Sequence, residues 1–206
     1  MSNLSPELKK AIKNVETYKF IISEKLQDTE RKAALLSLVD SVEETLILAP
    51  ASTRIEYHGA FVGGLVEQSL NVLKTMSVLN KAYETSIPTD SLVVTGLFYD
   101  IGKVGDGKTP YYLAKQSDWH NQQGIMYEVN PNMISMPVSL RSLFLLQDAR
   151  VRLTSEEHYA ISTVKDRVRQ SDESLPTTHE PFLAVVLQQA IRITSLKGSG
   201  RTSIVI

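Results

Sequence analysis

The chain has 206 residues, with 22 Lys and Arg against 23 Asp and Glu, so its formal charge at neutral pH is −1. This balance disfavours a protein that holds nucleic acid mainly by neutralising phosphates. The sequence contains no Cys, which excludes disulfides, thiolate metal ligands and cysteine nucleophiles. No apolar stretch approaches the roughly 20 residues of a membrane span. Residues 1–10 are polar and lack an apolar signal core, so we expect a cytoplasmic protein.

Helical patterns follow one another along the first half of the chain. Ser5-Pro6 is typical of a helix start, because Ser can cap the first turn and Pro needs no hydrogen bond there. Apolar residues then recur at spacings of three and four, and a second such stripe begins at Asp28 and ends at Pro50. We expect residues 1–50 to form an N-terminal helical region that packs on the rest of the protein.

Further helices are predicted on both sides of an irregular middle segment. One covers residues 62–83, and the next begins at Thr89 and is apolar on almost every face, which is typical of a helix buried inside a bundle. Later patterns predict a short helix over residues 138–147 and another after the capping box Thr154–Glu157. A last helix is expected over residues 180–196.

The connection over residues 103–137 is rich in Gly, Pro and Asn. Within it, Tyr111-Tyr112 and Met126-Tyr127 favour two short paired strands. The expected fold class is therefore all-α, a helical bundle with a short β-hairpin in this connection. Residues 170–178 are polar and predict a loop. The tail over residues 197–206 is expected to be flexible, although its apolar end favours contact with a partner or a sheet edge as an alternative.

Two segments, residues 57–70 and 96–105, contain the residues best suited to chemistry. His58 lies just before a predicted helix, and Asp100 and Lys103 lie at the polar end of the apolar helix. An ionised Asp at the end of a buried helix needs a partner, because burying a lone carboxylate is very costly. Lys103 is one candidate partner, and a metal ion shared with His58 is another.

These segments, together with Trp119-His120 and residues 124–130 and 140–147, resemble small HD-superfamily proteins encoded by tailed bacteriophages. The resemblance runs over about residues 55–196 and implies an HD-type helical domain over residues 51–196. Members of the HD superfamily are metal-dependent phosphohydrolases. The resemblance implies a metal site built from a first His, a His-Asp pair and a later Asp.

The chain departs from the family pattern at the metal-ligand positions. Tyr99 stands where the family has the His of its His-Asp pair, and a phenol is a poor ligand for a divalent metal. Ile191 replaces the later Asp and Val164 replaces a His of the phage group. Gln68 stands where another His is common. The family residues that remain are His58, Asp100, Lys103 and His120.

These losses favour a catalytically inactive protein, for which we expect no catalytic residue, no metal and no cofactor. It would bind a nucleotide in the residual cleft, or a host or phage protein on its surface, in the cytoplasm of the host cell. A homo-oligomer is a further alternative, and no membrane contact is expected. The residues expected to bind the ligand are His58, Tyr99, Asp100, Lys103, Trp119 and His120.

The alternative is an active phosphohydrolase on nucleotides or other phosphomonoesters, with a reduced metal site. His58 and Asp100 would then hold Mn²⁺, Mg²⁺, Fe²⁺ or Ni²⁺, and the catalytic residues would be Asp100, Lys103 and His120. Other conspicuous residues have structural explanations. We expect Gly63-Gly64 to allow close helix packing, and Trp119 to plug the mouth of the bundle.

Overall fold

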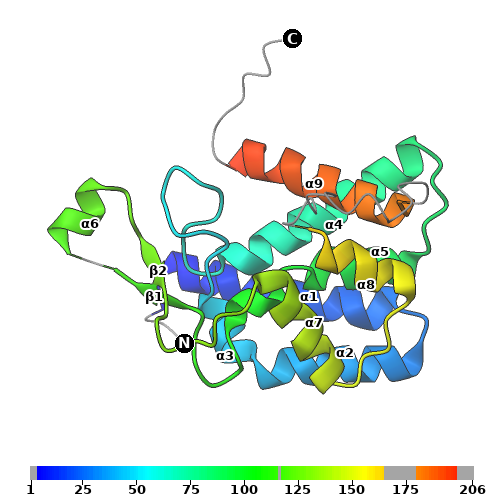
Figure 1. The fold of residues 1–206 in the computed structure, drawn as a ribbon, viewed down its shortest axis with the longest axis horizontal. Coiled ribbons are helices and arrows are strands. Elements are labelled where there is room, and N and C mark those ends of the chain that lie inside the picture. Colours follow the sequence, from blue (N-terminus) through cyan, green and yellow to red (C-terminus); the bar gives the residue numbers. More distant parts are fainter. Residues whose placement is uncertain (1–3, 116, 165–179, 199–206) are drawn as a thin grey trace, which may run out of the picture.

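The computed structural model describes residues 4–115, 117–164 and 180–198 (Figure 1). In these residues it contains nine α-helices: α1 (Pro6–Lys25), α2 (Thr29–Ser41), α3 (Glu43–Leu48), α4 (Gly64–Ala82), α5 (Thr89–Phe98), α6 (Asp118–Gln122), α7 (Val138–Asp148), α8 (Ser155–Ser162) and α9 (Phe182–Gly198). A 3₁₀ helix, η1, covers Ile101–Val104. Two short strands, β1 (Tyr112–Ala114) and β2 (Tyr127–Val129), pair as a hairpin. The predicted mostly helical fold with a hairpin is confirmed.

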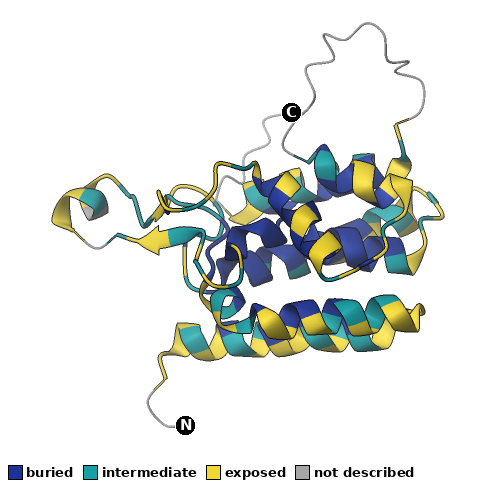
Figure 2. Ribbon diagram, turned by 60° about the horizontal axis from the view of Figure 1, so that its bottom comes forward, coloured by how far each residue is buried: buried dark blue, intermediate teal, exposed yellow. Residues whose placement is uncertain are grey.

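Helix α5 is the centre of the molecule, as its apolar sequence predicts. Every residue from Ser91 to Phe98 is buried, and α1, α4, α8 and α9 pack around the helix. Figure 2 shows buried residues gathered on the inner faces of the helices, with exposed residues on the outer faces. Because α5 is enclosed, the residues that follow it, including Asp100 and Lys103, are also buried. The fold therefore places Asp100 and Lys103, which the sequence singled out, inside the protein.

Helix α1 shares its core with the rest of the bundle. The hydroxyl of Tyr18 donates a hydrogen bond to the carbonyl of Leu97 at 2.6 Å, and its ring meets Phe98 edge-on at 5.4 Å between centroids. Val15 and Ile22, on the same face of α1, are completely buried. Burial raises the pKa of Tyr18 well above its usual value, so the phenol stays neutral and can donate this bond.

The single helix expected between Asp28 and Pro50 is wrong, because the chain bends at Val42 and forms α2 and α3 instead. The amide of Val42 donates to the carbonyls of both Leu38 and Val39, which tightens the last turn of α2. The bend leaves both Val42 and Leu46 buried in the core. The apolar stripe therefore continues across the break, and its spacing alone does not reveal where α2 ends.

The capping box that opens α8 forms as predicted and also anchors α2. The Thr154 hydroxyl accepts from the Glu157 amide at 3.2 Å, and the Glu157 carboxylate accepts from the Thr154 amide at 2.9 Å. The same carboxylate is fully buried and forms an ion pair with Arg31 of α2 at 2.9 Å. The predicted loop over residues 170–178 and the tail beyond Gly198 lie outside the described residues.

The hairpin carries a short helix at its tip and projects beyond the bundle (Figure 1). The strands are antiparallel, with Tyr112 opposite Val129. At the base of the hairpin, the Asn130 side chain donates to the Pro110 carbonyl at 3.0 Å, and its backbone amide donates to Tyr111 at 2.8 Å. Helix α6, at the tip, was not predicted from the sequence.

The two glycines before α4 allow the preceding loop to approach closely. Gly63 has a φ of +77°, and a Cβ there would lie 2.5 Å from the Cβ of Ala11. A Cβ on Gly64 would collide with the carbonyl oxygen of Gly59. This geometry supports the packing interpretation of the pair, because both positions exclude a side chain. None of the helices in the described part of the chain is long and apolar enough to cross a membrane.

Candidate functional site

Asp100 and Lys103 form an ion pair at the end of α5. Lys103 lies one turn after Asp100 in η1, and its Nζ is 2.5 Å from the Asp100 Oδ2 atom. The same ammonium donates to the backbone carbonyl of Ala51 at 2.5 Å. Both side chains are almost completely buried. The Asp100 carboxylate therefore has a counter-ion supplied by its own chain.

Tyr99 stands immediately before Asp100 and is almost completely enclosed. Burial, together with the nearby charge of Asp100, raises the pKa of Tyr99 well above its usual value, although a hydrogen bond with Gln68 partly opposes this. The side chain is thus a neutral phenol at physiological pH. A neutral phenol does not replace an imidazole as a ligand for a divalent metal.

Gln68 of α4 links Tyr99 to α9. Its Nε2 atom donates to Thr194 Oγ1 at 2.8 Å and lies 3.4 Å from Ser195 Oγ. Ser195 Oγ in turn lies 3.5 Å from His58 Nε2. A chain of polar contacts therefore runs from Tyr99 through Gln68 and Ser195 to His58. Sequence reasoning identified Gln68 only as a missing His and did not foresee this bridging position.

Two further positions at which the resemblance implies a ligand contribute apolar contacts instead. Val164 and Ile191 are half-buried and pack against the hydrophobic core. Within the residues that the structure describes, no group of three or more His, Cys, Asp and Glu side chains lies close enough together to hold a metal ion. Lys165, which follows Val164 in the sequence, lies outside those residues.

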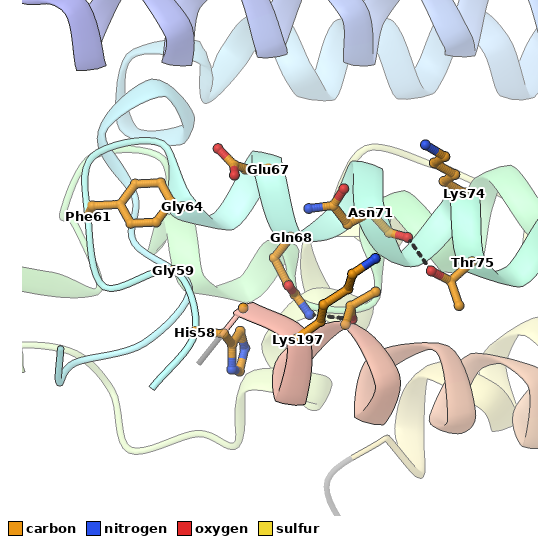
Figure 3. Close-up of a pocket in the computed structure, with 12 residues that line it drawn as sticks. His58, Gly59, Phe61, Gly64, Glu67, Gln68, Asn71, Lys74, Thr75 and Lys197 are labelled. Atoms are coloured by element: carbon orange, nitrogen blue, oxygen red, sulfur yellow. Dashed lines mark hydrogen bonds between the residues drawn. The ribbon is translucent and has the colours of Figure 1, made fainter. Parts of the chain in front are cut away.

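His58 opens onto a pocket of about 380 Å³ between α4 and α9 (Figure 3). Figure 3 shows Gln68 pointing from α4 towards α9, and Lys197 reaching from α9 towards α4. Asn71 and Lys74 lie further along α4 on the same pocket. The polar side chains that line it are His58, Glu67, Gln68, Asn71, Lys74, Thr75, Thr194 and Lys197.

The charge of this pocket is positive. Its one acidic residue, Glu67, is paired with Lys10 of α1 at 2.6 Å. Lys74 and Lys197 are exposed, and each adds a positive charge to the lining. Side-chain amides and hydroxyls supply further hydrogen-bond donors around them. Such a lining suits an anion with several oxygen atoms.

Trp119 and His120 do not line the pocket of His58. Both lie on α6 at the projecting tip, where the Trp119 side chain is 60% exposed. His120 Nδ1 is 2.5 Å from Ser117 Oγ, and its Nε2 is 3.2 Å from Glu128 Oε1. The expectation that Trp119 plugs the mouth of the bundle is wrong, because the hairpin carries it away from the helices.

The predicted ligand-binding residues therefore fall into separate places. His58 lines the pocket between α4 and α9, whereas Lys103 lines a different cavity beside the hairpin. Tyr99 and Asp100 are buried in the protein interior. Trp119 and His120 lie on α6, at the tip of the projecting hairpin. The chain matches no protein-family model, no curated protein and no solved structure.

Proposed function

We propose that this chain is a non-catalytic, HD-like protein that binds a nucleotide through its phosphates in the pocket between α4 and α9. The observation that carries the proposal is the buried pair of Asp100 and Lys103, with 2.5 Å between carboxylate and ammonium. An ammonium from the chain itself supplies the positive charge that a metal ion supplies in an HD enzyme.

The residues around Asp100 do not fit a catalytic divalent metal. Such a site needs several protein ligands of fixed geometry and an open position for water. Here Tyr99 is a buried neutral phenol, and Val164 and Ile191 are apolar. Asp100 is already neutralised by Lys103. These features support a protein that retains an HD-type arrangement over residues 51–196 without hydrolysing phosphate esters.

The pocket beside His58 supports a phosphate-bearing ligand. Lys74 of α4 and Lys197 of α9 are both among the residues that line it, so its positive charge comes from two different helices. Its volume of about 380 Å³ falls within the usual range for small-molecule sites. Gln68 and Asn71 add amide groups that can bind phosphate or ribose oxygens. A nucleotide offers all of these acceptors in one molecule.

The test is calorimetric titration of the full chain with nucleoside mono- and triphosphates, with and without Mn²⁺, while product formation is followed by chromatography. We expect saturable binding, no dependence on Mn²⁺ and no product. Replacing both Lys74 and Lys197 by Gln should weaken binding about tenfold or more, since tenfold corresponds to about 1.4 kcal/mol. Lys81→Gln, on the same helix but away from the pocket, is the matched control and should bind normally.

Two results would contradict the proposal. Nucleotide hydrolysis that requires Mn²⁺ and disappears in Asp100→Asn would establish the active phosphohydrolase instead. Absence of binding for every nucleotide at concentrations of about 1 mM would remove the phosphate ligand from consideration.

A further inference from the structure

A second cavity of about 360 Å³ lies between the hairpin, α3 and the loop that follows α3. It differs in character from the pocket beside His58, because apolar and aromatic side chains make up most of its lining. The residues that shape it most are Leu48, Val62, Lys103, Tyr111, Tyr112 and Tyr127. A concave, mostly apolar cavity with a few polar groups is the usual form of a small-molecule site.

The aromatic wall of this cavity is held in place by neighbouring residues. The guanidinium of Arg141 lies 5.3 Å from the ring centroid of Tyr111, and the buried Arg141 donates to the Ile134 carbonyl at 2.8 Å. The rings of Tyr111 and Tyr112 meet edge-on, with 4.7 Å between their centroids. Because these rings are already ordered, a ligand would not have to fix them on binding.

The charges around the cavity disfavour an anion. Of the residues that line it, Glu44 and Lys103 are charged, and the Lys103 ammonium is already paired with Asp100. Burial, together with the nearby charge of Asp100, raises the pKa of Tyr112, so its hydroxyl keeps its proton at neutral pH and can donate a hydrogen bond. The cavity therefore combines flat aromatic surfaces, no net positive charge and a hydrogen-bond donor.

We infer that this cavity is a second binding site, for a flat, uncharged aromatic ring that carries a hydrogen-bond acceptor, of the size of a nucleobase. Tyrosine faces bind such rings by stacking, which is largely tolerant of the identity of the base. The inference goes beyond the proposed function and does not depend on it, because the two cavities share no lining residue.

Strand β1 offers a matched pair of variants for the test. Ala114 lines the cavity and is exposed, so Ala114→Trp should fill the space without disturbing the core. Leu113 is its neighbour, is also exposed and does not line the cavity, because successive side chains of a strand face opposite sides. Leu113→Trp therefore adds an equally large side chain to the opposite face.

The experiment titrates the full chain with uncharged probes, adenosine, uridine and N-acetyl-tryptophanamide, by calorimetry and ligand-observed NMR. We expect wild type and Leu113→Trp to bind nucleoside equally, and Ala114→Trp to bind about tenfold more weakly or worse. The Lys74→Gln/Lys197→Gln variant should also bind nucleoside normally, which separates this site from the phosphate pocket. Circular dichroism and thermal unfolding would verify that each variant is folded.

The choice of probes distinguishes a site for nucleobases from a site for aromatic rings in general. Binding of nucleosides alone supports a nucleobase site, and binding of the tryptophan amide as well supports a site for aromatic rings in general. The inference is overturned if no probe binds saturably at concentrations of about 5 mM. It is also overturned if Ala114→Trp binds as wild type does, or if folded Leu113→Trp loses binding to the same extent.

Discussion

The ammonium nitrogen of Lys103 lies 2.5 Å from the carboxylate oxygen Oδ2 of Asp100, in a pair whose side chains are only 6% and 5% exposed. Two opposite charges so deeply buried depend on each other, because each would be strongly destabilised alone. The pair also connects the end of α5 to the loop before α4, since Lys103 donates to the Ala51 carbonyl. Its energetic role can be tested without knowledge of any ligand.

Asp100→Ala should destabilise the protein by about 3–5 kcal/mol, because it leaves the Lys103 ammonium buried without its carboxylate. The double variant Asp100→Leu/Lys103→Met should recover much of this loss, since it removes both charges. Urea unfolding gives the free energies. Glu56→Ala breaks the exposed pair with Arg54 and should change stability by less than about 1 kcal/mol. If Asp100→Ala and Glu56→Ala reduced the free energy of unfolding equally, the assigned role of the buried pair would be contradicted.

Gln68→Leu should destabilise the protein by about 1–3 kcal/mol, because the buried Tyr99 hydroxyl and Thr194 both lose a hydrogen-bond partner. Tyr99→Phe in the Gln68→Leu background should cost less than Tyr99→Phe in wild type. Chemical unfolding of the four proteins gives this coupling as a double-mutant cycle. Asn71→Ala, one turn later on the exposed side of α4, is the control and should be nearly neutral. If the losses in unfolding free energy of Gln68→Leu and Tyr99→Phe simply add in the double variant, the hydrogen bond between Gln68 and Tyr99 is excluded.

Stability should fall as the pH rises above about 10. Burial raises the pKa of Tyr18 and Tyr99 in the folded protein, so the folded state holds protons that the unfolded chain releases near its ordinary tyrosine pKa. Stability is then complete below about pH 10 and falls by about 1.4 kcal/mol per pH unit for each such tyrosine above it. Unfolding midpoints measured across this range, with tyrosinate absorbance, give the slope.

Tyr18→Phe removes one of these groups, so the slope of stability against pH should become shallower. The same change removes the hydrogen bond to Leu97 and should cost about 1–2 kcal/mol at neutral pH. Tyr83, at 75% exposure, provides the comparison, because Tyr83→Phe alters an exposed side chain and should leave the stability at neutral pH nearly unchanged. Early ionisation of Tyr18 in the folded state would contradict its burial.

Gly64→Ala should destabilise the protein by more than about 2 kcal/mol, because the new Cβ collides with the backbone carbonyl of Gly59. The loop that carries His58 must then move, so nucleotide affinity should fall together with stability. Thermal unfolding and calorimetry measure the two effects. Ser77→Ala, at an exposed position of the same helix, should affect neither by a measurable amount.

The sequence predicted the helices best where local signals and core packing agree. The apolar run after Thr89 forms the buried helix α5, and the Thr154 capping box forms both of its hydrogen bonds. The bend at Val42 could not be predicted in the same way, because no Gly or Pro marks it. Val42 and Leu46 are both buried, and an unbroken helix would also place them on one face, so the apolar stripe does not reveal the break.

The site was harder to predict than the fold. The cost of a buried carboxylate predicted that Asp100 needs a partner, with Lys103 and a shared metal ion as the two candidates, and the structure shows an ion pair with Lys103. Gln68 had a readable signal, since it lies on the apolar face of its helix with Leu65 and Val72, where a polar side chain needs a partner. The sequence carried no signal for the position of Trp119, because the length and direction of the hairpin depend on tertiary contacts.

The packing of α9 against α4 also determines when this protein can fold during its synthesis. The two helices contact each other extensively although residues 83–181 separate them in the chain. A nascent chain that has completed α4 and α5 therefore exposes their apolar faces to solvent until α9 has emerged. Contacts between such distant segments slow folding and prolong the exposure of apolar surface that is prone to aggregate. A chain that ended before α9 would leave these apolar faces of α4 and α5 uncovered.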